Sequence, residues 1–107
     1  MTAQAALIWS DFPHVGSAKQ VISSLLDERL IACGNILPNV PSLFIWRGER
    51  DETVECAVLF KTTAARLDAA VDRLSALHPY ETPAIMGWTV NADAGTLAWL
   101  QRETGGL

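Results

Sequence analysis

Residues 77–83, Leu-His-Pro-Tyr-Glu-Thr-Pro, gather side chains that could do chemistry. His78, Tyr80 and Glu81 supply an imidazole, a phenol and a carboxylate, which suit the binding of a cation or a polar ligand. The two prolines of the stretch predict the end of a helix and the start of an extended segment, because proline breaks a helix and restrains the residue before it. We therefore expect this cluster at a boundary between two elements, where the fold decides what it meets.

Hydrophobic periodicity predicts the elements that position this cluster. An apolar run over residues 5–10 indicates a strand in the centre of a sheet, and strict alternation over 54–61 indicates a second strand. The other expected elements are a helix capped by Ser17 and running to about Leu30, an interrupted strand over 32–47, a hairpin turn near residue 49, a helix capped by Thr62 or Thr63 and ended before Pro79, a strand over 84–90 with a bulge at Gly87, and a short helix over 97–100.

The order of these elements predicts a fold of the α+β class. Strand, helix, strand, strand, helix, strand is the ferredoxin-like (βαββαβ) sandwich, in which one antiparallel sheet carries two helices on one face, here followed by a short C-terminal helix. We expect one domain over residues 1–107. The second sheet face stays bare and carries apolar residues, so we expect oligomerisation to cover it. Trp9, Trp88 and Trp99 are expected in the core.

The expected topology also predicts a metal site. The first and fourth strands are neighbours and antiparallel in this fold, so the end of one lies beside the start of the other, and the second helix ends there too. The groups expected to meet at this rim are Ser10, Asp11, His14, His78 and Glu81. Imidazoles and carboxylates suit Cu(II), Zn(II) or another divalent cation. In the alternative interpretation, His78 bonds a carbonyl at the helix C-terminus and His14 is a solvated loop residue.

Composition and motifs exclude several classes of function. A net charge of −4 with scattered Lys and Arg argues against binding of nucleic acid. No apolar run approaches the roughly 20 residues of a membrane span, and no signal peptide is recognisable, so we expect a cytoplasmic protein. No phosphate-binding loop or nucleophile elbow is present, and no Cys–His pair is expected at plausible distance, so we expect no organic cofactor and no enzyme activity.

The two cysteines are expected to remain thiols. A hairpin turning near residue 49 places Cys56 opposite residue 42, which leaves Cys33 about 30 Å away along the strand. A disulfide requires Cα atoms within about 7 Å. No bridge is therefore predicted within the chain.

Several stretches, read together and in order, resemble the CutA divalent-cation tolerance family. They are residues 28–38 (ERLIACGNILP), 46–48 (WRG), 61–62 (KT), 77–83 (LHPYETP) and 97–100 (LAWL). The resemblance implies a ferredoxin-like subunit in a homotrimer and a role in tolerance of copper and other divalent ions. Ser10 stands where some members carry a cysteine, so the softest candidate copper ligand is absent.

A second set of residues is expected at contacts between subunits. Glu55 and Lys61 share one face of the third strand because their separation is even, and an oligomer that buries them must supply partners, for example Tyr80 of another subunit. One interpretation is an interfacial salt bridge that fixes register, with Trp46 as an interface anchor. The alternative is a signalling or interaction trimer in which these residues line intersubunit clefts that accept a small ligand or partner protein.

Overall fold

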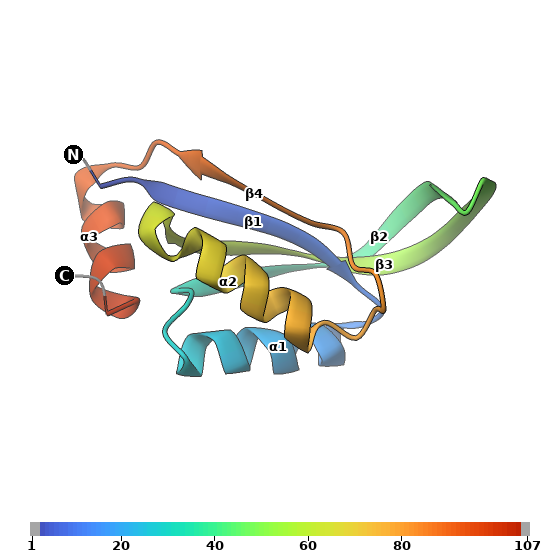
Figure 1. The fold of residues 1–107 in the computed structure, drawn as a ribbon, viewed down its shortest axis with the longest axis horizontal. Coiled ribbons are helices and arrows are strands. Elements are labelled where there is room, and N and C mark those ends of the chain that lie inside the picture. Colours follow the sequence, from blue (N-terminus) through green and yellow to red (C-terminus); the bar gives the residue numbers. More distant parts are fainter. Residues whose placement is uncertain (1–2, 106–107) are drawn as a thin grey trace.

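The computed structural model describes residues 3–105, which form one four-stranded sheet and three helices (Figure 1). The elements in chain order are β1 (Ala5–Phe12), α1 (Val15–Asp27), β2 (Cys33–Trp46), β3 (Glu49–Thr63), α2 (Ala64–Leu77), β4 (Ile85–Val90) and α3 (Ala94–Glu103). No helix in this range is long and apolar enough to span a membrane.

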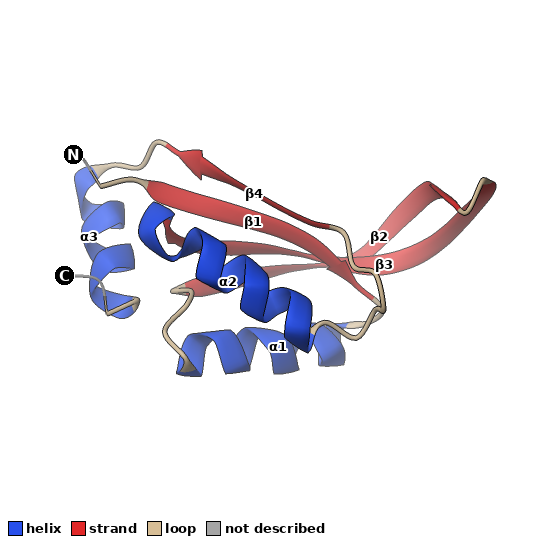
Figure 2. Ribbon diagram, in the orientation of Figure 1, coloured by secondary structure: helices blue, strands red, loops and turns tan. Residues whose placement is uncertain are grey.

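The sheet is antiparallel with the order β2-β3-β1-β4, so β1 is central, as predicted. Helices α1 and α2 cover one face and α3 stands at the end of the sheet near both termini (Figure 2). The predicted ferredoxin-like fold is therefore confirmed. Alternation along β1 buries every second side chain beneath the helices, where they meet the apolar stripes of both helices. The largest buried side chains of this core are Ile8, Phe12, Leu25, Ile31, Phe60 and Leu74.

Helix α1 begins and ends earlier than the sequence predicted. His14, not Ser17, is the N-cap, because its Nδ1 accepts a hydrogen bond from the Ser17 N–H at 3.1 Å. The Ser17 hydroxyl donates back to the His14 carbonyl at 2.8 Å. At the other end Arg29 adopts a left-handed conformation (φ 58°), and its N–H bonds the Leu26 carbonyl while the Leu30 N–H bonds that of Leu25. This pattern closes the helix without the glycine usually found there.

The hairpin of β2 and β3 turns at Arg47 and Gly48, one to two residues before the predicted position. Both residues have positive φ (52° and 79°), as the tight two-residue hairpin turn requires. Ser42 therefore pairs with Thr53 and not with Cys56, which was the predicted partner. A bulge lies between Leu37 and Val40, at the predicted interruption. Beyond it the strands continue as an arm, defined here as residues 40–54, that projects past the helices (Figure 1).

Two further details differ from the sequence-based expectation. Gly87 pairs regularly with Ile8 and marks no bulge. A side chain at this position would crowd α2, because a Cβ there would lie 2.8 Å from Leu67 Cδ1. Cys33 pairs with Lys61, five residues from Cys56 along β3, or about 17 Å, closer than predicted. Both thiols are nevertheless free, as predicted.

The sheet face opposite α1 and α2 is uncovered within the described chain, and we call it the open face. The strand register places these side chains on it: Leu7, Trp9, Asp11, Leu37, Glu55, Leu59, Lys61, Met86 and Trp88. Met86 is 61% exposed and Trp88 is 44% exposed. The expectation that Trp9 and Trp88 belong to the core was wrong, because alternation directs both to the open face; Trp99 is only partly buried, on α3.

Candidate functional site

The imidazole of His78 is held between α2, β1 and the segment before β4. Its Nδ1 accepts a hydrogen bond from the Tyr80 N–H at 3.1 Å, so Nδ1 carries no proton. The proton therefore lies on Nε2, which donates to the Asp11 carbonyl at 2.9 Å and faces Ser10 Oγ at 3.1 Å. Burial lowers the pKa of His78 more than the bond to the Asp11 carbonyl raises it, which keeps the ring neutral.

These contacts agree in part with the alternative interpretation of His78, in which the ring bonds a carbonyl. The ring stacks on Phe12 with centroids 4.3 Å apart, and both nitrogens already have partners. It bonds a carbonyl, as the alternative interpretation expected, but one on β1 and not one at the end of its own helix. Ser10 Oγ is engaged as well, since it donates to the Ala84 carbonyl at 2.8 Å.

Asp11 supplies the most unusual carboxylate of this region. Its Oδ1 is buried and has no hydrogen-bond partner among residues 3–105. Burial raises the pKa of Asp11, and the neighbouring carboxylate of Glu55 raises it further, whereas Trp9 lowers it by less. Burial and the Glu55 charge destabilise the ionised form of Asp11, and a nearby cation would stabilise it.

Glu55 forms a pair with Tyr80 inside the subunit. The Tyr80 hydroxyl donates to Glu55 Oε2 at 2.6 Å, a short bond between part-buried groups. Burial and the Glu55 carboxylate raise the pKa of Tyr80 far above its usual value, so the phenol remains a donor. The sequence predicted a bond of this kind with Tyr80 of another subunit, whereas it forms within one chain. The sequence also missed that Glu55 lies beside Asp11. The register signals the second point, because Asp11 pairs with Ala57, two residues from Glu55.

The predicted metal ligands come together only in part. Ser10 and His78 meet, as the topology predicted, but Asp11 contacts His78 only through its backbone carbonyl, because its carboxylate lies on the open face. His14 instead caps α1 through its Nδ1, and Glu81 is exposed. In the part of the chain that the structure describes, no three His, Cys, Asp or Glu side chains are grouped so that they could hold a metal ion. A complete metal site within one subunit therefore stays a prediction.

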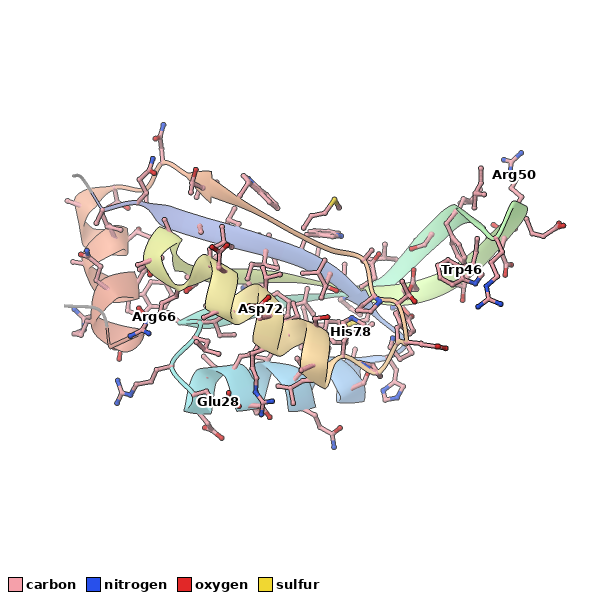
Figure 3. All side chains as sticks on the ribbon, viewed as in Figure 1. Glu28, Trp46, Arg50, Arg66, Asp72 and His78 are labelled. Atoms are coloured by element: carbon pink, nitrogen blue, oxygen red, sulfur yellow. The ribbon has the colours of Figure 1, made fainter. Side chains whose placement is uncertain are left out.

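A groove of about 930 Å³ lies where the end of β1 meets the arm. Its carboxylates are those of Asp11, Glu55 and Glu81, and its aromatic rings are those of Trp9, Phe44, Trp46 and Tyr80. Its described lining contains no Lys, Arg or His. Figure 3 shows Trp46 out on the arm and His78 at the junction of arm and body. The groove thus offers aromatic walls and negative charge to whatever enters it.

A family model for the CutA1 divalent ion tolerance protein matches residues 6–103. The chain belongs to the CutA family. The divalent-cation tolerance protein CutA of Salmonella newport (strain SL254) is 32% identical over 98 residues, covering 91% of this chain and 85% of the relative. The CutA family is thus one of divalent-cation tolerance proteins and not a known enzyme family.

Solved CutA structures share the fold over almost the whole chain. CutA1 from Ehrlichia chaffeensis superposes with a TM-score of 0.90 at 32% identity, over 97% of this chain and 98% of that one. CutA from Xylella fastidiosa gives 0.89 at 36% identity, over 94% and 98%. CutA from Archaeoglobus fulgidus, described as periplasmic, gives 0.87 at 28% identity, over 94% and 98%. The motifs that suggested CutA all lie inside the region matched by the family model.

Lys61 lies at the other end of the open face of this CutA chain. It pairs with Leu7 and Cys33, half-buried, and forms no ion pair with any carboxylate of residues 3–105. Contact between Lys61 and Glu55 inside one subunit is excluded, because six residues of β3, or about 20 Å, separate them. Trp46, the predicted anchor, is 48% exposed and stacks beneath Arg47 at 5.6 Å.

Proposed function

We propose that this chain forms a homotrimer that binds divalent cations, Cu(II) among them, and contributes to their tolerance without catalysing a reaction. Membership of the CutA family supports tolerance of divalent cations in general. The observation that carries the cation site is the buried Asp11 Oδ1, which has no partner in residues 3–105 and borders a groove lined by acidic but not basic side chains. Carboxylate oxygens suit divalent cations, and uncompensated negative charge favours their approach.

The proposed ligands differ in how readily they bind a cation. Asp11 and Glu81 have carboxylate oxygens at the groove, and His14 lies at the start of α1. His78 becomes a ligand only if its Nδ1 gives up the bond from Tyr80, and Ser10 only if its hydroxyl leaves His78 or Ala84. The cation is therefore proposed to take carboxylate oxygens first, with further ligands from water or a neighbouring subunit.

The open face supports the trimer. Apolar side chains of β1 and β4, with Met86 and Trp88 at the edge, form a surface that soluble monomers rarely leave uncovered. The arm projects from the same subunit and adds Phe44 and Trp46. Self-association through these surfaces buries them, and a closed ring of three is the arrangement that the family resemblance implies.

Calorimetric titration with Cu(II) and Zn(II) tests the cation site. We expect wild-type affinity to fall about tenfold or more in Asp11→Asn, which keeps the side-chain shape but removes the charge, and to fall less in Glu81→Gln. Asp68→Asn, a carboxylate on the helical side, is the matched control and should bind as wild type. Affinity that is indifferent to Asp11, His14, His78 and Glu81 alike would reject the rim site.

The aromatic walls of the groove favour a second candidate. In that case the protein is a signalling or interaction trimer whose intersubunit clefts accept a small ligand or partner protein, and metal binding is incidental. A thermal-shift screen of small molecules tests it. Ligand-induced stabilisation should then depend on Trp46, Glu55, Lys61 and Tyr80, and should be unchanged in Asp68→Asn, outside the groove.

We also propose that the protein acts in the cytoplasm, although the relative from Archaeoglobus fulgidus is described as periplasmic. Fractionation of cells that express the native gene tests this, and recovery from the periplasmic fraction would contradict it.

A further inference from the structure

The geometry points to Lys61 of one copy of this chain as the occupant of the groove of another copy, where its ammonium pairs with Glu55 beside Tyr80. The inference rests on the homotrimer of the proposed function and names one charged contact within it, at Glu55, while Asp11 Oδ1 stays the atom proposed for the divalent cation.

Glu55 is built to receive a cation. Tyr80 fixes one carboxylate oxygen through the 2.6 Å bond to Oε2, and Oε1 makes no hydrogen bond within residues 3–105. Glu55 is half-buried and lines the groove, and the bond to Tyr80 restrains its orientation. The nearby Asp11 carboxylate adds a second negative charge to the same place.

Within residues 3–105 no ion pair joins a cation to either of these carboxylates. The ion pairs of the described chain join Arg73 to Glu28 and Arg102 to Glu103, both outside the groove. Arg50 lies on the face of the arm opposite to Glu55, beside Ile45, and Arg47 lies over the ring of Trp46 at the hairpin tip. Negative charge that is partly withdrawn from water and left unpaired is costly, so the groove is complementary to a cation from elsewhere.

Lys61 is a cation that forms no ion pair with a carboxylate of residues 3–105. The register makes it the one cation among the strand residues of the open face in the described range, with Leu7 beside it on β1 and Cys33 on β2. A copy that covers this apolar face also covers Lys61, and a covered ammonium requires a carboxylate. Its alkyl stem and charged end also fit aromatic walls such as Phe44 and Trp46, which favour such cations.

The pair must form between chains, because about 20 Å of β3 separates Glu55 from Lys61 in one chain. The two complementary patches occupy opposite ends of the open face. A contact between two different patches is heterologous, and its repetition gives a ring when the rotation closes and an open filament when it does not. The charges therefore favour head-to-tail assembly. At each interface the Lys61 ammonium of one copy donates and the Glu55 carboxylate of the next accepts.

Zero-length carbodiimide cross-linking tests the pair on the wild-type protein. The sequence contains only two lysines, Lys19 and Lys61, so a linked lysine is assigned without ambiguity by mass spectrometry. In a mixture of ¹⁴N and ¹⁵N chains we expect Lys61–Glu55 or Lys61–Asp11 peptides of mixed label, and no corresponding product from Lys19. Absence of both products, or links from Lys61 to other carboxylates only, would overturn the inference.

Charge reversal provides the second test. Lys61→Glu and Glu55→Lys should each weaken association about tenfold or more by analytical ultracentrifugation, and the double variant should recover most of the loss. Lys19→Glu is the matched control and should associate as wild type. A wild-type trimer that is unaffected by Lys61→Glu contradicts this inference alone, whereas a wild-type monomer contradicts the proposed trimer as well.

Discussion

At His78 a single protonation state is consistent with every contact of the ring. Nδ1 accepts from Tyr80, Nε2 donates to Asp11, and the ring stacks on Phe12. We therefore expect His78→Ala to lower the free energy of unfolding by about 2–4 kcal/mol, since it opens a cavity and leaves polar groups unpaired.

Urea unfolding at equal chain concentration measures the effect of this change. His14→Ala is the control, because it removes the other histidine and only one exposed helix cap, at a cost of about 1 kcal/mol. Equal losses in the two variants would contradict a structural role for the His78 network.

The lowered pKa of His78 also predicts how stability depends on pH. The folded ring binds a proton less readily than the unfolded ring, whose pKa is near 6.5. Its contribution is thus fully present above that value and is lost as the pH falls below it, toward the lower folded pKa. The raised pKa of Asp11 acts in the opposite sense, adding stability as the pH falls toward 3.8.

His78→Gln separates these two effects, since it keeps a polar side chain and leaves Asp11 in place. The difference in unfolding free energy between wild type and His78→Gln should shrink from about pH 7.5 to about pH 5. Parallel pH profiles of the two proteins would show that His78 is not the titrating group.

At the scale of elements, the contact between β2 and α1 depends on the absence of a side chain at Gly34. A Cβ built there lies 2.8, 2.9 and 3.0 Å from the Cγ1, Cδ1 and Cγ2 atoms of Ile22, a buried residue. We expect Gly34→Ala to destabilise the protein by about 1–3 kcal/mol through overpacking. Thermal or urea unfolding measures this.

A double-variant cycle identifies the clash as the cause. Ile22→Ala removes all three opposing atoms, so Gly34→Ala should cost much less, or nothing, in that background. Gly95→Ala is the matched control, because its Cβ meets only Asp93 Oδ2 at 3.5 Å and should leave stability unchanged or raised. Additive effects of the Gly34 and Ile22 changes would exclude the contact.

The elements themselves were predictable from periodicity, and so were the ends of α2 at Thr63 and before Pro79, but the ends of α1 and the register of the hairpin were not. Alternation and apolar stripes identified all four strands and both main helices, because burial of one face imposes these periods. The start of α1 was missed because histidine is a rare N-cap, and its end because Arg29 adopts a conformation that usually requires glycine. The hairpin register differs from the predicted one because it is set by the turn residues Arg47 and Gly48 alone.

At the scale of the whole molecule, topology predicted part of the candidate site. Neighbouring antiparallel strands bring Ser10 and Asp11 to the start of β4, and the end of α2 adds His78, whatever the side chains do. The hydrogen bonds of His78 and the pairing of Glu55 with Tyr80 depend on side-chain conformations and on the path of the arm. Spacing along the sequence carries no information about either.

Assembly of the subunits should depend on the open face. Trp88 is 44% exposed on β4, and its burial between subunits should contribute about 1–3 kcal/mol to each interface. Trp88→Ser should therefore shift the equilibrium from three chains to folded single chains. Light scattering over a dilution series measures mass, and circular dichroism verifies that the variant is folded.

Leu26→Ser is the matched control, since Leu26 is a similarly exposed (41%) apolar residue on α1, and it should leave the mass unchanged. An unchanged mass in Trp88→Ser at every dilution would place the contact between chains elsewhere, with the arm as the next surface to change.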